Sequence, residues 1–213
     1  MTEGRGDLTT FAVFRGYRLM RTLLALLLSA LAVQASVLKD LEPSEQAGLE
    51  KGDVVLRSED VSGGVWPRLI VYVHVKAPVG VVERIFRDYA GASSYIPGLV
   101  SATVLRQPDP DTYEVRYINA MPVIGESQSV VRNRYSREGE VLVVRWKLLE
   151  ATHADESTGE LRVEPVTARS CVLRYSNYVK PKSSLAKLAR GAAAGEARKT
   201  VLALKKESER RGG

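Results

Sequence analysis

Six neutral polar side chains lie within apolar segments of the second half of the chain: Tyr117, Asn119, Ser129, Asn133, Tyr175 and Asn177. In an extended strand, alternate residues face the same side of a sheet, so these groups can share one face with apolar neighbours. Hydroxyl and amide groups on such a face orient the polar end of a bound molecule. The alternative is that they lie near strand ends and pair with backbone or water, and the sequence leaves both interpretations open.

Residues that perform acid–base or nucleophilic chemistry are scarce. His74 falls on the outward face of a predicted strand and His153 in a polar loop. The single cysteine, Cys171, lies within a predicted strand, where a structural thiol is favoured over a nucleophile. These residues form no pattern of metal ligands. We therefore predict no catalytic residue, no metal site and no cofactor.

The elements that would position these side chains follow from apolar periodicity and turn residues. Alternation predicts strands over 68–76, 99–107, 112–119, 126–136, 141–150, 158–166 and 170–179. Their short connections favour antiparallel pairing. Val82, Ile85 and Tyr89 have helical spacing, and a long helix is predicted over 183–209.

Hairpin turns decide which face of each strand points inward. If Glu138 and Gly139 form a two-residue turn, Tyr135 lies opposite Leu142 and the charged residues fall on the other face. A tight turn after Asp109 makes the same choice for the preceding hairpin. The side chains then expected to line a ligand site are Val115, Tyr117, Asn119, Ser129, Val131, Asn133, Val144, Trp146, Leu148, Leu161, Tyr175 and Asn177.

The predicted C-terminal helix has small residues at its centre. Leu188, Ala192 and Ala193 belong to its apolar stripe, and Gly191 and Gly195 each cost about 1 kcal/mol relative to alanine. Small residues there leave volume between helix and sheet. Close packing of the helix on the sheet also favours small residues, so this alternative stays open.

Two predicted loop segments are more apolar than solvent-exposed loops usually are. The residues concerned are Tyr95, Ile96, Leu99, Met121, Val123 and Ile124. We expect them to form the mouth of a cavity, with transient membrane contact, although they would also serve simply to cover the core.

The N-terminal segment has the order of an export signal. Arg18 and Arg21 precede an apolar run over 23–33, and small residues favour cleavage after Ala35. Residues 1–35 are thus predicted to be a signal peptide of an exported protein, with 1–19 a mis-assigned start if translation begins at Met20. Residues 36–65 form a lead-in with a short helix and strand, 66–209 the main domain and 210–213 a disordered tail.

The composition is that of an ordinary globular protein. The 213 residues carry a formal net charge of +6, too diffuse to indicate nucleic-acid binding. We expect a monomer whose partner is a hydrophobic small molecule or lipid.

Several short segments resemble the START-like superfamily of lipid-transfer, coenzyme-Q-binding and polyketide cyclase proteins. They are VHVKAP (73–78), FRDY (86–89), YIP (95–97), GELRVEP (159–165) and LRY (173–175). This resemblance implies an α+β helix-grip fold, in which a curved antiparallel sheet of about seven strands wraps around a long C-terminal helix. It further implies binding or transfer of a lipid-like ligand such as a phospholipid or isoprenoid quinone. The alternatives are a cyclase/aromatase-like enzyme and an interaction domain with a collapsed pocket.

Overall fold

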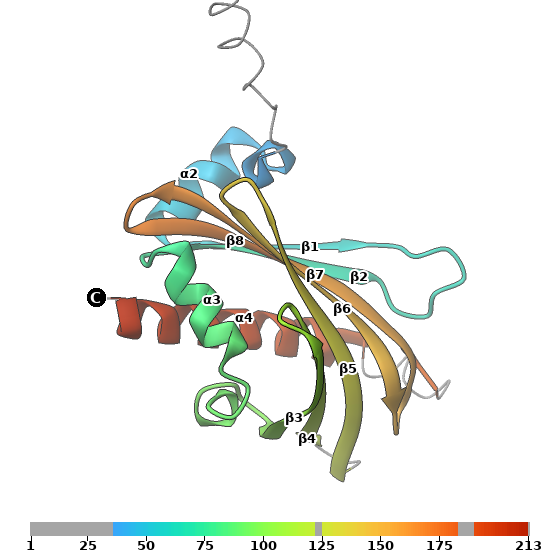
Figure 1. Cartoon of the computed structure of the whole chain (residues 1–213). Coiled ribbons are helices and arrows are strands. Elements are labelled where there is room, and N and C mark those ends of the chain that lie inside the picture. The colour runs from blue at the N-terminus through green and yellow to red at the C-terminus, as the bar shows by residue number, and fades with distance from the viewer. Residues whose placement is uncertain (1–35, 122–124, 183–189, 213) are drawn as a thin grey trace, which may run out of the picture. The chain divides into compact units, whose positions relative to one another are not determined.

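The protein is built on one antiparallel sheet with helices on both faces (Figure 1). The computed structural model describes residues 36–121, 125–182 and 190–212. The eight strands, in spatial order, are β1 (Val54–Glu59), β2 (Arg68–Val75), β8 (Ser170–Pro181), β7 (Ala154–Thr167), β6 (Val141–Ala151), β5 (Gly125–Glu138), β4 (Thr112–Met121) and β3 (Leu99–Asp109).

The predicted helix-grip fold is confirmed: the sheet curves around the long C-terminal helix α4 (Arg190–Gly212) (Figure 1). The sheet has one strand more than the roughly seven expected. The short strand of the lead-in, β1, pairs with β2 from Val54 opposite Val73 to Glu59 opposite Arg68. The lead-in therefore belongs to the same sheet as the rest of the domain.

The β5–β6 hairpin differs from the predicted register by two residues. Glu138 lies opposite Val141, so the turn residues are Gly139 and Glu140, and Tyr135 pairs with Val144. Gly139 has a φ of 61°, which a glycine adopts without strain and which suits the first turn position. Because side chains alternate with period two, this shift keeps the predicted facing from the turn as far as the Val131–Leu148 pair, beyond which an irregularity between Val130 and Val131 changes the register. In the β3–β4 hairpin, Val104 and Ala102 lie opposite Val115 and Tyr117, as predicted.

The main core lies on the concave face of the sheet. Helix α3 (Val79–Arg87) contributes Val82 and Ile85, and α4 contributes Val201 and Leu204. The sheet contributes fully buried side chains from its central strands: Val73, Val115, Val144, Leu161, Val163 and Leu173. The short helix η3 (Ala92–Ser94) covers one end of this core.

A second core lies on the convex face, which includes the face of β2 that was predicted to point outward. Ile70 and Tyr72 are buried there beneath the lead-in segment, which supplies Val37, Leu41 and Leu49. The lead-in folds as η2 (Val37–Asp40) and α2 (Pro43–Lys51), with Gly52 ending α2 in the left-handed conformation. Both faces of β2 are thus apolar because helices cover both.

Helix α4 is fixed to the sheet near its C-terminal end. The Lys205 ammonium donates to the backbone oxygen of His74 at 2.7 Å, and the Lys76 amide donates to Glu209 Oε1 at 3.0 Å. Residues 183–189, where the sequence analysis began this helix, lie outside the described residues.

The predicted disordered tail is corrected for Arg210 and Arg211, which continue α4. Both guanidinium groups pair with Glu207, and Arg211 also pairs with Asp88, with 3.1 Å between Nη1 and Oδ2. The Arg211–Asp88 pair links the last helical turn of α4 to the C-terminal end of α3.

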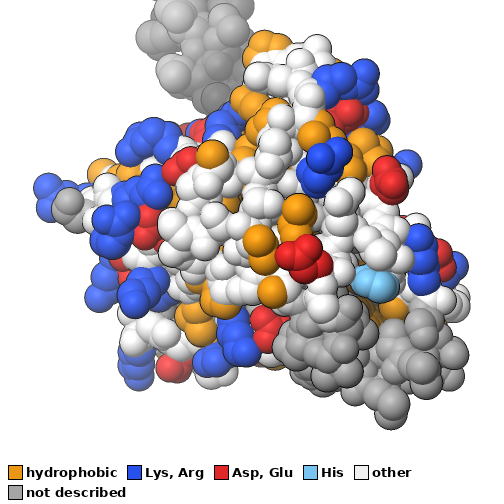
Figure 2. Space-filling model, turned by 90° about the horizontal axis from the view of Figure 1, so that it is seen from below, with side chains coloured by type: hydrophobic (Ala, Val, Ile, Leu, Met, Phe, Trp, Pro, Cys, Tyr) orange, Lys and Arg blue, Asp and Glu red, His pale blue; other side chains and the backbone are white. Residues whose placement is uncertain are grey.

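The surface viewed in Figure 2 carries small, separate groups of apolar side chains among charged ones. Within the described ranges, no helix is long and apolar enough to cross a membrane. The predicted signal segment, residues 1–35, lies outside those ranges, so its role stays a prediction.

Replacing Leu49 tests the second core. Leu49 is 1% exposed, and Leu49→Ala should lower the free energy of unfolding by about 2–5 kcal/mol through lost packing and a cavity. Chemical denaturation measures this change. The matched control is Leu56→Ala, at a side chain 42% exposed on β1, which should change stability by about 0.5 kcal/mol or less. Equal effects of the two changes would show that the lead-in does not unfold with the rest.

Candidate functional site

A cavity of about 240 Å³ lies between the concave face of the sheet, α3 with η3, and α4. Its walls come from six strands, β3 to β8, and from α3, η3 and α4, so elements from most of the chain meet around it. The described residues that line it are Phe86, Tyr89, Ala92, Tyr95, Ile96, Leu99, Tyr117, Asn119, Val131, Asn133, Trp146, Ser157, Tyr175 and Thr200.

One wall is a cluster of aromatic rings fixed by a chain of hydrogen bonds. The Tyr135 hydroxyl donates to the Phe86 backbone oxygen at 3.1 Å, so the 2.8 Å bond between Tyr89 and Tyr135 has Tyr89 as its donor. Burial raises the pKa of Tyr89 to about 12, which keeps its proton in place. Arg87 caps the cluster from outside, with its guanidinium carbon 3.9 Å from the centre of the Tyr135 ring.

A second wall is formed by Trp146 and Tyr175. Their ring centres are 5.1 Å apart, and the Trp146 indole donates to Asn177 Oδ1 at 3.1 Å. Gly159 lies directly opposite Trp146 in the sheet. A Cβ at position 159 would lie 2.2 Å from the indole ring, so only glycine lets the ring adopt this position.

The hydrogen bonds of Tyr117 and Asn133 bring polar groups to the cavity. Asn133 is 3% exposed, and its side-chain amide donates to the Tyr117 hydroxyl at 3.3 Å. Burial raises the pKa of Tyr117 well above its ordinary value, and burial alone raises the pKa of Tyr175 to about 12. Both phenols therefore stay protonated at physiological pH.

The structure brings many of the predicted site residues together, while their role in binding stays a prediction. Those that line the cavity are Tyr95, Ile96, Leu99, Tyr117, Asn119, Val131, Asn133, Trp146 and Tyr175. Asn177 supports the wall through Trp146. Three others, Val115, Val144 and Leu161, are fully buried in the core cluster next to the cavity.

The remaining predicted residues lie elsewhere or are not described. Ser129 borders a separate small hollow between β5 and β6, and the partly buried Leu148 is not among the described residues lining the cavity. Leu188, Val123 and Ile124 lie outside the described residues, and the side chains of Met121, Ala192 and Ala193 are not described.

Five lining residues were not predicted as site residues: Phe86, Tyr89, Ala92, Ser157 and Thr200. Phe86 lies on α3 and Tyr89 follows its end, and helical apolar spacing does not distinguish a side chain in a packed core from one that borders a cavity. Ser157 was placed in a loop, whereas β7 begins at Ala154. Thr200 lies next to the apolar stripe of α4 and gave no signal in the sequence.

The described part of the cavity lining contains no histidine, carboxylate, lysine, arginine or cysteine. Within the same described ranges, no group of acidic, histidine and cysteine residues is suited to hold a metal ion. Cys171 is buried in the core, where burial raises the pKa of its thiol to about 12. The chemistry this lining offers is hydrogen bonding by neutral groups within an apolar enclosure.

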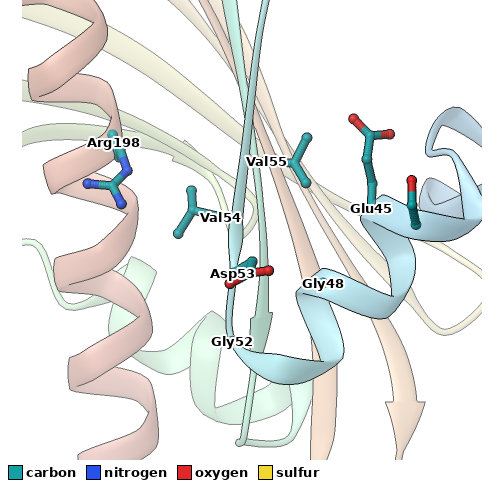
Figure 3. Close-up of a pocket in the computed structure, with 8 residues that line it drawn as sticks. Glu45, Gly48, Gly52, Asp53, Val54, Val55 and Arg198 are labelled. Atoms are coloured by element: carbon teal, nitrogen blue, oxygen red, sulfur yellow. The ribbon is translucent and has the colours of Figure 1, made fainter.

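A second hollow lies at the surface where β1 passes between α2 and α4 (Figure 3). Asp53 and Glu45 reach it from the side of α2, and Arg198 from α4. It is open to solvent, and Glu45 is already paired with Arg57. Its lining includes the charged side chains of Glu45, Asp53 and Arg198, which do not suit a hydrophobic ligand.

Replacing Gly159 tests the Trp146 wall. The methyl group of Gly159→Ala would also lie 2.4 Å from the Ser176 backbone oxygen, so we expect a loss of about 1–3 kcal/mol in stability and an altered near-UV signal from displaced Trp146. The control is Gly195→Ala on α4, where no atom of the described residues lies within 4 Å of the added methyl group and alanine should stabilise the helix by about 0.5–1 kcal/mol. A neutral effect at position 159 would contradict the close approach.

Comparison with known proteins agrees with this architecture. Residues 68–209 match the protein family described as polyketide cyclase / dehydrase and lipid transport. No curated protein matches the chain at the sequence level.

Solved structures with the same fold include both lipid-transfer proteins and enzymes. A STAR-related lipid transfer protein from Xanthomonas axonopodis is 17% identical, with a TM-score of 0.66 over 73% of this chain and 93% of its own. The Zhui aromatase/cyclase from Streptomyces sp. R1128 is 19% identical, with a TM-score of 0.55 over 68% of this chain and 94% of its own. Human STARD10 is 13% identical, with a TM-score of 0.64 over 85% of this chain and 83% of its own.

The sequence identities to these solved structures are below 20%, so the structural similarity establishes the fold alone. The family match is separate evidence, and it spans two thirds of the sequence. The chain belongs to the polyketide cyclase / dehydrase and lipid transport family.

Proposed function

We propose that this protein binds a hydrophobic, lipid-like ligand in the cavity and carries it without transforming it. The observation that carries this proposal is a cavity of about 240 Å³ walled largely by aromatic and aliphatic side chains. Burying roughly 200 Å² of apolar ligand surface there would contribute roughly 5 kcal/mol to binding. That is enough for reversible binding, which is what a carrier needs.

The volume of the cavity limits how much of a ligand it can hold. Pockets for drug-sized molecules usually measure about 300–1,000 Å³, so this cavity is smaller than most. It suits a compact apolar group or a single chain. A two-chain phospholipid or a long isoprenoid quinone would extend through the mouth at Tyr95, Ile96 and Leu99. Contact of this mouth with a membrane would deliver the ligand.

A cyclase-like enzyme is the second candidate, and the structural likeness to the Streptomyces aromatase/cyclase supports it. Such chemistry needs a group that accepts or donates a proton at the substrate. The described lining offers phenols, amides and hydroxyls, and the raised pKa values of Tyr117 and Tyr175 make these phenols poor bases at neutral pH. We therefore favour the carrier.

Filling the cavity should abolish binding. Val131 lines the cavity on β5, and in Val131→Phe a phenyl ring would occupy much of its volume. The full chain purified from its own compartment should carry a lipid in native mass spectrometry, and Val131→Phe should carry at least tenfold less. Val166→Phe makes the same change at a side chain 48% exposed and should bind like the unaltered protein. A protein that stays empty after incubation with lipid vesicles would overturn the proposal.

The proposal includes export, because the N-terminal segment has the order of a signal peptide. The protein recovered outside the cytoplasm should begin at Ser36 when its intact mass is measured. Ala35→Arg should block cleavage and retain the apolar segment. A cytoplasmic protein with an N-terminus at Met1 or Met20 would contradict export.

A further inference from the structure

Several hydrogen-bond donors in the cavity wall are already paired within the protein. Tyr135 donates to the Phe86 backbone oxygen and Tyr89 donates to Tyr135, so neither phenol has a proton left for a ligand. The Trp146 N–H is engaged by Asn177. These groups form the wall but do not select a ligand by hydrogen bonding.

Tyr117 differs because its hydroxyl accepts a bond instead of donating one. Asn133 donates to the Tyr117 oxygen at 3.3 Å, which leaves the phenolic proton available. Tyr117 lines the cavity, so a ligand atom can receive this proton.

Tyr175 supplies a second donor. Its ring packs on Trp146, and among the described residues its hydroxyl has no hydrogen-bond partner. Tyr175 and Tyr117 both line the same cavity, Tyr175 from β8 and Tyr117 from β4. Two neutral donors therefore serve the same small cavity.

Free donors in an apolar enclosure disfavour a pure hydrocarbon. In the empty protein, water can bond to both phenols, since a cavity of this size has room for several water molecules. A hydrocarbon displaces that water and leaves each donor unpaired, which weakens binding by about tenfold for each group. A ligand with its own acceptor avoids this loss.

An anionic group is disfavoured for a different reason. Within the described lining there is no cation to pair with a buried carboxylate or phosphate. Arg87, which caps the aromatic wall, already bonds to Glu83 and Asp111. The lining thus suits a neutral acceptor better than a charged one.

We propose that the ligand is an uncharged apolar molecule bearing a carbonyl-type acceptor, which Tyr117 and Tyr175 bind through their hydroxyl groups. This inference rests on the proposed function, because it assumes that the cavity holds a hydrophobic ligand. It narrows the ligand to ketones, quinones, esters and similar neutral compounds.

Three probes of equal chain length test the inference on the full chain: a medium-chain methyl ketone, the corresponding alkane and the corresponding carboxylate. Calorimetric titration should show the ketone binding about tenfold or more tightly than either of the others. Tyr117→Phe and Tyr175→Phe should each weaken ketone binding by about tenfold and leave alkane binding unchanged or improved. The infrared carbonyl band of the bound ketone should shift upward in each variant as a hydrogen bond is lost.

Tyr178→Phe is the matched control, since Tyr178 lies on β8 with its hydroxyl against Gly64 and is not among the described lining residues. Tyr117→Phe removes the partner of Asn133 and can impair folding, so Tyr175→Phe, which breaks no described hydrogen bond, serves as the second variant. Equal affinity for ketone and alkane, or tightest binding of the carboxylate, would overturn this inference while the carrier function stands. Failure of all three probes to bind would overturn both.

Discussion

The concave face of the sheet is covered unevenly by α4, and the rest of the architecture follows from this. Toward its C-terminus the helix packs closely, with Val201 and Leu204 buried in the core. Thr200, which immediately precedes Val201, lines the cavity. The helix cannot tilt to close that gap, because Lys205 and Glu209 bond to the backbone next to β2 and Arg211 pairs with Asp88. The fold thus keeps a hollow at one end of its core.

The aromatic side chains around that hollow are held by groups outside it. Arg87 lies over the Tyr135 ring and bonds to the Tyr113 hydroxyl at 3.2 Å, and Gly159 makes room for the Trp146 indole. A cavity with rigid walls keeps its shape without a ligand, so less ordering is needed on binding. This rigidity agrees with a site that recognises shape first and a few polar atoms second.

Most of the sheet could be predicted from sequence because alternation and turn residues act locally. The β5–β6 register was wrong by two residues, yet Asn133 and Trp146 were placed on the correct face, since an even shift preserves facing. The burial of Ile70 and Tyr72 was missed because it depends on the lead-in helix, which packs against them from a distant part of the sequence. The contribution of Phe86 and Tyr89 to the cavity was missed because the same spacing describes a helix that packs a core and one that borders a void.

The position of β2 has a consequence for how the chain reaches its native state. This early strand lies between β1 and the last strand, β8, so that Tyr72 pairs with Arg174, 102 residues further on. Loop closure over such a separation carries a large entropic cost, and folds dominated by distant pairings fold slowly. Until β8 has been synthesised, one edge of β2 has no neighbour and the apolar face of Val71 and Val73 has no complete core. A nascent chain would therefore expose this apolar face to chaperones until β8 has emerged from the ribosome.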